Sequence, residues 1–561
     1  MTPTLPRWAW ILIAVVAGLA WFSVLDHRKL QHPDEGRYSE IAREMAVSGD
    51  WVTPRLNDLK YFEKPPLQYW STAAVFRTFG TDEWTARLVP ALAGFLGVLV
   101  VGFTAGRLAG ATAGVYAGLG LLGCVWHIGL SHFVTLDALL TFWLTVALCA
   151  FLLAQQATAP TATVRRWMLV MYAALALATL TKGLVALVLP GASLVLYTII
   201  VRDVGPWRRL HLVPGLAVYL VVTAPWFILV SRANPEFAQF FFIHEHFQRF
   251  LSTEHRRTGA WWYFVPLFVG GLMPWPLAWA ATVVPSWRRS AAAANGFRWE
   301  RFCLIHAAFV FVFFSLSGSK LPSYILPMFP ALMLVFGVGL TRISARLLGW
   351  MTLFGVVAAT VLLLVLVAGW PQWSARFATA ATPIGLFLDF GPWIQTAVGI
   401  FAAGALAAAV AFRRGTPRAK SVGILLLSLS SLAGFQVAFA GHDAFRPTRS
   451  AFDILRAAEA AEGGALAPGA PVYQLHGYDQ TLSFYLARPT TLVAFVDEFR
   501  LGLRAEPDKG IADEAEWIRR WETLPQGYAL MPKSNYAQLA ARGVPMRVLA
   551  ADPRRVFVAR R

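Results

Sequence analysis

The sequence has 561 residues, of which 57% are hydrophobic and only 14% are charged. Soluble domains carry about a quarter charged residues, so this composition excludes a soluble globular protein and indicates a polytopic helical membrane protein. Alternating segments are too few for a transmembrane barrel. The net charge of +18 is no nucleic-acid signal, because the excess lies in the first 440 residues, with 33 basic against 17 acidic. Membrane orientation and anionic lipids account for it there.

Apolar runs of membrane-spanning length, about 17–25 residues, predict thirteen transmembrane helices. The first follows a single arginine and no clear cleavage site, which favours an uncleaved span over a signal peptide. Segment 66–80 is a shorter apolar helix. The predicted spans are 8–25, 86–107, 111–130, 133–154, 166–180, 183–201, 210–231, 261–284, 301–316, 321–340, 346–369, 391–411 and 421–440.

The positions of the basic residues agree with a count of thirteen spans. With the N-terminus in the cytoplasm, every short loop on that side carries Lys or Arg, as the positive-inside rule requires. The same count places the larger polar segments 26–85, 232–260 and 441–561 together on the opposite face. All three cysteines (Cys124, Cys149 and Cys303) lie in apolar runs and predict neither disulfides nor a cysteine metal site.

The first polar loop carries the densest charge in the chain, in HPDEGRYSEIAREMAVSGDW and then YFEKPPLQYW. Such a segment is too costly to bury in lipid. Pro33 and the acidic pair after it predict the start of a helix, and Gly49 predicts its end. Tyr38, Ile41 and Met45 form one apolar stripe, which is typical of a helix lying in the membrane interface.

The tail, residues 441–561, alternates helical segments at 451–462, 513–522 and 535–542 with β-like PVYQLHG, TTLVAFV and RRVFVAR. This pattern predicts a small α/β domain outside the membrane, next to a transmembrane domain of residues 1–440. No catalytic motif is visible in the tail, and we expect it to serve as a structural element or a substrate lid.

The first loop resembles that of polyprenyl-phosphate glycosyltransferases of the GT-C type, in particular the lipid A aminoarabinose transferases, which are relatives of protein O-mannosyltransferases. Further similar segments follow in order: TLTKG, FFIHEHFQRF, WWYFVPLFVGGLMPW and GSKLPSYILP. The resemblance covers roughly residues 8–340. It implies an enzyme of the bacterial inner membrane, with the site and the tail facing the periplasm.

This family resemblance also implies the substrates. The donor is 4-amino-4-deoxy-L-arabinose on undecaprenyl phosphate, the acceptor is a phosphate of lipid A, and the modification confers resistance to polymyxin and other cationic peptides. No nucleic-acid partner is implied, and a monomer is expected among membrane lipids. The absence of a Gly-rich phosphate loop agrees with a lipid-borne donor.

Asp34 is the catalytic candidate, as the acidic residue of the family's Asp-Glu pair. It could act as a base, orient the acceptor or pair with the sugar's ammonium group, and a helix N-cap is the structural alternative. The donor phosphate is expected to contact Lys64, Arg249 and Tyr324. Contacts to the sugar or to other substrate groups are expected from Arg37, Tyr61, Glu63, Asp137, Lys182 and Lys320.

Several of these residues have simpler explanations. The lysines and Arg249 could anchor span ends to lipid head groups, and Asp137 near a span end needs a charge partner or a sugar contact. No cofactor is required, although Glu63 and His244 could hold a divalent metal such as zinc.

Two other functions compete with this prediction. One is the same chemistry with another sugar or a protein acceptor. The other is a lipid flippase or transporter, for which no internal repeat is apparent and the acidic residues cluster outside the bilayer.

Overall fold

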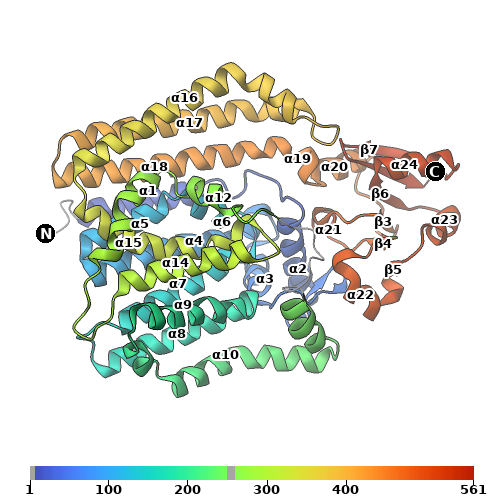
Figure 1. Cartoon of the computed structure of the whole chain (residues 1–561). Helices are drawn as coiled ribbons and strands as arrows, with labels where there is room; N and C mark the ends of the chain where they lie inside the picture. Colours follow the sequence, from blue (N-terminus) through green and yellow to red (C-terminus); the bar gives the residue numbers. More distant parts are fainter. Residues whose placement is uncertain (1–6, 249–258, 561) are drawn as a thin grey trace.

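The computed structural model describes residues 7–248 and 259–560. Long apolar helices form a bundle, and a smaller α/β domain covers one end of it, at the right of Figure 1. The bundle helices are α1 (Arg7–Phe22), α4 (Glu83–Ala109), α5 (Ala111–Leu122), α6 (Val125–Ser131), α7 (Leu136–Ala154), α8 (Thr161–Lys182), α9 (Val185–Val201), α10 (Leu212–Ala233), α12 (Phe264–Gly271), α13 (Pro276–Arg289), α14 (Trp299–Leu316), α15 (Met328–Arg342), α16 (Ala345–Phe377), α17 (Ile384–Arg413) and α18 (Pro417–Gly441).

Every predicted span coincides with one of these helices or with a bent pair of them. In the described residues, nine helices are long and apolar enough to cross a membrane, and up to eleven if each bent pair counts as one span. Two shorter apolar helices, Leu12–Phe22 and Val185–Val201, remain. The chain is therefore a polytopic membrane protein, and the count of thirteen crossings stays a prediction.

The predicted spans 111–130 and 261–284 are each broken into two helices, a feature that the sequence analysis did not predict. α5 and α6 meet at 61°, and α12 and α13 meet at 103°. Prolines 274 and 276 explain the second break, since proline has no backbone N–H to continue a helix. The two breaks contact each other, with Val125 N–H donating to the carbonyl of Met273 at 3.1 Å. Each break thus supplies a polar partner to the other inside the bundle.

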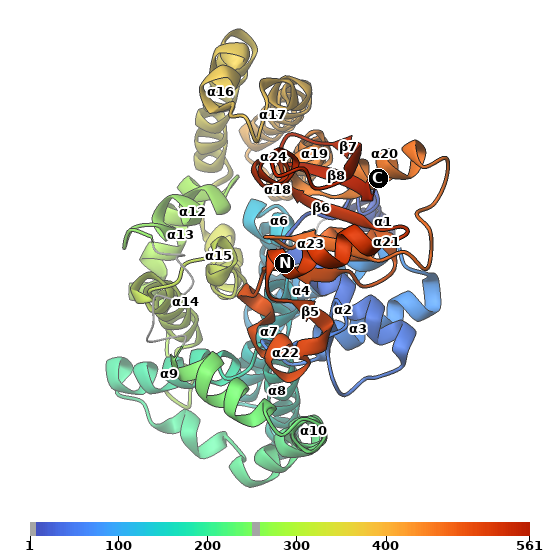
Figure 2. The ribbon, with the colours of Figure 1, turned by 90° about the vertical axis from the view of Figure 1, so that its right-hand side faces the viewer.

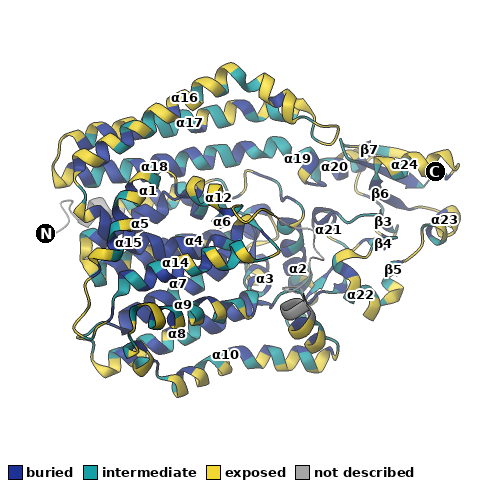
Figure 3. Ribbon diagram, in the orientation of Figure 1, coloured by how far each residue is buried: buried dark blue, intermediate teal, exposed yellow. Residues whose placement is uncertain are grey.

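The bundle exposes much of its apolar surface. Large side chains of α16, among them Trp350, Phe354 and Leu364, are more than 60% exposed, and Figure 3 shows α16 mostly in the colour of exposed residues. Such a surface is typical of contact with lipid tails.

The first loop forms helix α2 (Asp34–Ser48), a short hairpin β1 (Arg55–Leu56) and β2 (Leu59–Lys60), and helix α3 (Leu67–Phe79). α2 ends at Gly49 in the left-handed conformation, at φ 74°, as predicted.

After α18 come the short helices η4 (His442–Phe445) and α19 (Arg446–Arg449), and then a six-stranded sheet of order β5-β4-β3-β6-β8-β7. Neighbours among β5, β4, β3 and β6 are parallel, and β8 pairs antiparallel with both β6 and β7. This confirms the predicted α/β tail domain. Its remaining elements are α20 (Phe452–Ala461), β3 (Val472–Leu475), α21 (Gln480–Leu486), β4 (Thr491–Val493), η5 (Asp497–Phe499), α22 (Arg500–Ala505), η6 (Pro507–Lys509), β5 (Gly510–Ile511), α23 (Glu514–Thr523), β6 (Tyr528–Pro532), α24 (Lys533–Ala541), β7 (Met546–Ala551) and β8 (Arg555–Arg560).

The apolar stripe of α2 packs against other parts of the protein, which the sequence analysis did not predict. Tyr38, Ile41 and Met45 are buried in a core that also contains Phe484 and Phe499 of the tail. α2 lies between α3 and α21, and Figure 2 shows the tail in front of the first loop at this end of the bundle. The tail therefore covers the apolar stripe of α2 in this structure.

Candidate active site

The acidic pair at the start of α2 divides between the protein interior and the surface. Glu35 is fully buried, whereas the side chain of Asp34 is 29% exposed. No side-chain capping bond forms at this helix start, so capping does not explain Asp34.

Glu35 is the centre of a buried ion-pair network. It accepts two hydrogen bonds from Arg87 of α4, at 2.8 and 3.0 Å, and one each from the backbone N–H of Gln31 and of Val134. Burial opposes ionisation of this carboxyl, but Arg87 and Arg28 outweigh it and hold the pKa of Glu35 below its ordinary value. Glu35 therefore fixes the start of α2 to the bundle.

Asp34 faces Arg37, one turn further along α2. Nη1 of Arg37 lies 3.4 Å from Oδ1 of Asp34, and its Nε lies 2.6 Å from Oε2 of Glu498 in η5 of the tail. The guanidinium thus stands between two carboxylates that are far apart in the sequence, and one of them stays partly open to solvent.

Two tyrosines line the same region. Burial raises the pKa of Tyr38 and that of Tyr61, and the carboxylates of Asp34 and Glu63 respectively add to the shift. Both phenols are therefore neutral at physiological pH. Within the described residues the buried hydroxyl of Tyr61 has no hydrogen-bond partner, which suits a donor to a substrate oxygen.

Lys64 follows Glu63 directly, ahead of Pro65 and Pro66, and both charged side chains are half-buried. Nζ of Lys64 donates to the backbone carbonyl of Glu63 at 2.7 Å. The prolines fix the backbone here, so the ammonium group is held close to its own loop.

A second cluster of predicted residues joins three helix ends. Nζ of Lys182, at the end of α8, lies 2.5 Å from Oδ1 of Asp137, at the start of α7. It also lies 4.9 Å from the ring centre of Tyr324 in η3 (Pro322–Ile325). Asp137 thus has the charge partner that its position required.

Lys320 makes local contacts in the structure, and its expected contact with a substrate stays a prediction. Its Nζ donates to the backbone carbonyls of Ser315 and Ser317, at 2.9 and 2.7 Å, and so satisfies acceptors at the end of α14. Arg249 lies outside the described residues, and so does the side chain of His244. The predicted Glu63–His244 metal pair therefore stays a prediction. One acidic group in the described part, Asp26, Asp82 and Glu83, has ligand atoms within 4.8 Å of one another.

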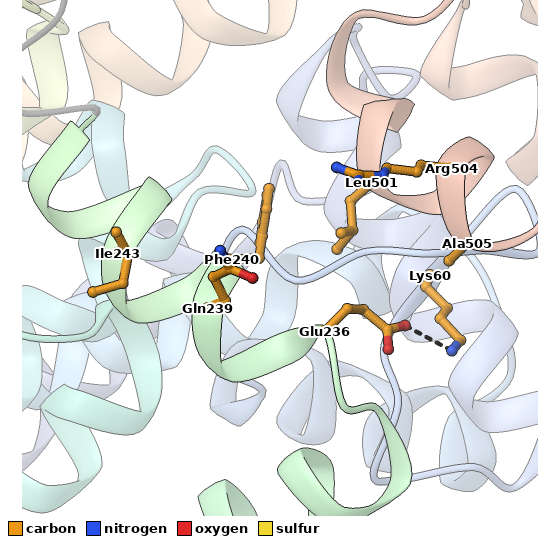
Figure 4. Close-up of a pocket in the computed structure, with 8 residues that line it drawn as sticks. All are labelled: Lys60, Glu236, Gln239, Phe240, Ile243, Leu501, Arg504 and Ala505. Carbon is orange, nitrogen blue, oxygen red and sulfur yellow. Dashed lines mark hydrogen bonds and ion pairs between the residues drawn. The ribbon is translucent and has the colours of Figure 1, made fainter.

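A cavity of about 560 Å³ opens where the three polar segments meet (Figure 4). Its lining is Lys60, Glu236, Gln239, Phe240, Ile243, Leu501, Arg504 and Ala505. Lys60 and Glu236 form an ion pair at 2.8 Å. The three segments therefore share one face of the protein, as the charge pattern predicts, and the mixed lining suits an amphipathic ligand of ordinary pocket size.

The tail is fastened to the first loop by many polar contacts. Asn57 of the hairpin, 3% exposed, bonds to the backbone of Thr490 and to Ser483. Arg55 pairs with Glu506 at 3.0 Å, and Lys509 pairs with Asp58 at 2.8 Å. The tail accordingly packs against the first loop in this structure, and its role as a structural element or a substrate lid stays a prediction.

A polytopic helical bundle whose charged first loop is covered by a C-terminal α/β domain is the architecture of GT-C membrane glycosyltransferases. Residues 8–247 match the family model of dolichyl-phosphate-mannose-protein mannosyltransferase, and residues 459–560 match that of the aminoarabinose transferase C-terminal domain. The crystal structure of ArnT from Cupriavidus metallidurans bound to undecaprenyl phosphate is 40% identical, with a TM-score of 0.92 over 99% of each chain. The chain belongs to the ArnT family.

Curated relatives agree with this assignment. The undecaprenyl phosphate-alpha-4-amino-4-deoxy-L-arabinose arabinosyl transferase of Erwinia tasmaniensis is 32% identical over 367 residues, which are 64% of this chain and 65% of the relative. The protein of the same name from Pseudomonas aeruginosa is 33% identical over 346 residues, 60% of each chain. The matches thus span less than two thirds of these relatives.

Two residues at the site escaped the sequence analysis. Arg87 was visible as a charge at the edge of the predicted span 86–107, a position that calls for a partner. Glu498 follows strand β4, and side chains beyond the carboxyl ends of parallel strands commonly serve binding sites. That position was the only local signal for Glu498.

Proposed function

We propose that the chain transfers 4-amino-4-deoxy-L-arabinose from undecaprenyl phosphate to a phosphate of lipid A. The carrying observation is the full-length likeness to ArnT bound to undecaprenyl phosphate, together with a partly open carboxylate, Asp34, on a loop held between bundle and tail. The reaction takes place at the periplasmic face of the bacterial inner membrane, where the site and the tail lie.

In this reaction a phosphate oxygen of the acceptor forms a bond to the anomeric carbon of the sugar. The bond from that carbon to the donor phosphate breaks, and its electron pair leaves with undecaprenyl phosphate. Positive charge develops on the sugar, which a carboxylate stabilises, while cations stabilise the departing phosphate. Asp34 fits the first role, and Lys64 and Arg249 fit the second.

An acceptor phosphate is already ionised near neutral pH and needs no strong base. Asp34 therefore acts by orienting the substrates and stabilising charge. Tyr61 and Glu63 contact the sugar, Tyr324 supplies a hydroxyl to the donor phosphate, and the Asp137–Lys182 pair shapes the site between the helix ends. The amphipathic cavity around Lys60 and Arg504 offers one approach for a lipid substrate with an anionic head group.

Lipid A from cells that make the donor but lack their own transferase provides the test. Cells expressing the chain should gain the mass of an aminopentose on lipid A by mass spectrometry, and cells expressing a well-folded Asp34→Asn variant should not. Addition by both would remove Asp34 from its role. No addition by either, with donor lipid present, would favour another sugar or a protein acceptor. Sugar transfer by the purified protein in detergent, without a second compartment, would exclude a flippase.

A further inference from the structure

The tail contributes a charged group to the first loop, although its sequence carries no catalytic motif. Glu498 reaches Arg37 across 461 positions of the chain, with 2.6 Å between Oε2 and Nε. Its other oxygen accepts a hydrogen bond from Nε2 of Gln480 at 2.8 Å. One oxygen is thus held by a hydrogen bond and the other by the charge of Arg37, because in the described residues neither Oε2 of Glu498 nor Nε of Arg37 has a hydrogen-bond partner. The side chain of Glu498 is 8% exposed.

The close approach of tail and loop depends on a glycine. A Cβ at Gly36 would lie 2.6 to 2.8 Å from backbone atoms of Gln480 and Thr481, closer than any side chain tolerates. Gly36 therefore lets the start of α21 lie directly on α2. This contact brings Gln480, and with it Glu498, to Arg37.

The three charged groups form a series from the interior to the opening. Exposure of the side chains rises from Glu498 (8%) through Arg37 (11%) to Asp34 (29%). The guanidinium lies closer to the inner carboxylate, with an ion-pair distance of 2.6 Å to Oε2 of Glu498, and its hydrogen bond to Asp34 is long, at 3.4 Å. Arginine and carboxylate readily form a two-point pair when nothing competes, so Glu498 keeps Arg37 from closing over Asp34.

Burial at this position disfavours the charged form of Glu498. Burial raises the pKa of Glu498 to about 7; Arg37 opposes the shift, and nearby Glu63 adds to it. The titratable groups that face it are Arg37, Tyr61, Glu63, Tyr478 and Asp497. A buried carboxyl group with a pKa shifted by burial and by neighbouring charges is typical of a functional site.

We propose that Glu498 is a positioning residue of the transferase site, which holds the guanidinium of Arg37 so that the Asp34 carboxylate stays open to the substrates. The inference rests on the proposed function and assigns the tail a direct part in it. Glu498 acts through Arg37 and forms no bond to the reacting atoms.

The test is a double-mutant cycle with purified protein, the lipid-linked aminoarabinose donor and lipid A. Glu498→Gln should lower kcat by about tenfold to a hundredfold, the size of a misplacement effect, and leave the donor KM close to the wild-type value. Arg37→Gln/Glu498→Gln should be no slower than Arg37→Gln alone, because Glu498 has nothing to position once Arg37 is neutral.

Glu506→Gln is the matched control, since it removes a tail carboxylate from another first-loop arginine, Arg55. Its effect should multiply with that of Arg37→Gln. The proposal would be overturned if the kcat losses of Glu498→Gln and Arg37→Gln also multiplied in the double variant. A wild-type kcat for Glu498→Gln would overturn it as well.

Thermal unfolding distinguishes a failure of the positioning role of Glu498 from a failure of the proposed transferase function. A carboxyl group whose pKa is higher in the folded than in the unfolded state makes the protein less stable as the pH rises from the unfolded pKa to the folded pKa. Glu498→Gln should therefore melt no lower than the wild type at pH 8, whereas a residue that only docks the tail would melt lower. If the wild type transfers no sugar, the proposed function fails, and a lowered Tm for Glu498→Gln independently overturns the positioning role.

Discussion

Glu35 and Arg87 are joined by two hydrogen bonds, Nε to Oε1 at 2.8 Å and Nη2 to Oε2 at 3.0 Å, and both side chains are buried. Arg87 also donates to the backbone carbonyls of Leu25 and Arg28. The pair ties the end of the first span, the start of α2 and the start of α4 into one unit. It thereby sets the place of Asp34, the residue immediately before Glu35 at the start of α2.

Glu35→Gln should destabilise the protein strongly. The substitution leaves the Arg87 guanidinium buried without a countercharge, a loss of about 3–5 kcal/mol for a broken buried pair. Thermal unfolding in lipid nanodiscs measures it. Asp34→Asn is the matched neighbour and should alter stability by less than about 0.5 kcal/mol, as half-exposed sites do. Equal melting of Glu35→Gln and the wild type would contradict the structural role.

Asp34→Asn should fold and bind donor yet transfer sugar at least about a hundredfold more slowly, the size of a lost electrostatic contact to a transition state. Single-turnover transfer to lipid A, followed by mass spectrometry, measures the rate. A variant with a near-normal rate would move the catalytic role to another carboxylate of the loop, such as Glu63.

Acidification should weaken the protein through Glu35. Its folded pKa lies below the ordinary value of 4.5, so its stabilisation is present above pH 4.5 and is lost as pH falls through the folded value. The difference in Tm between wild type and Glu35→Gln should therefore shrink on acidification. A difference that stays constant from neutral pH to about pH 3 would show that charge is not its source.

The Asp137–Lys182 pair should behave as a coupled unit. Asp137→Asn leaves a largely buried ammonium group unpaired, and we expect a loss of about 3 kcal/mol. Asp137→Leu/Lys182→Met should regain most of the stability, because apolar side chains of similar volume replace a buried pair well. The double variant should remain inactive if the pair contacts the sugar. Stability with full activity would reduce it to a structural pair.

Substitutions of Lys64 and of Lys320 should have different effects, one on donor binding and the other on stability. Lys64→Gln should raise the KM for the donor about tenfold, as a lost charged contact to phosphate. Lys320→Met should leave that KM unchanged and lower stability by about 1–3 kcal/mol, since the carbonyls of Ser315 and Ser317 lose their donor. Donor titrations and melting curves on both variants measure these effects. A raised donor KM for Lys320→Met with a normal KM for Lys64→Gln would contradict the prediction.

Run lengths and charge placement were sufficient to predict most helices, because apolar length and capping are local properties of a sequence. The end of α2 at Gly49 and the three tail helices follow from the same kind of signal. The breaks in α5–α6 and α12–α13 were missed, since hydropathy does not respond to chain direction. Pro274 and Pro276 were the local signs of the second break.

The site was predictable only where its residues lie close in sequence. Asp34, Arg37, Glu63 and Lys64 share one loop, and a resemblance to known loops identifies them. The ion pair between Arg37 and Glu498 joins residues 461 positions apart, and neither hydrophobic periodicity nor motif spacing records such a contact. Whether Asp137 would find Lys182 was likewise decided by the packing of α7 on α8.

The long separation between the first loop and the tail also orders events during biosynthesis. Asn57 meets Thr490 across 433 residues, which a ribosome adds in roughly 20 to 90 s at about 5–20 residues per second. Through that interval the first loop is already made but lacks its cover and the carboxylate that holds Arg37. A chain interrupted after α18 would present the loop without a finished site, so completion of the polypeptide is itself the step that makes the enzyme competent.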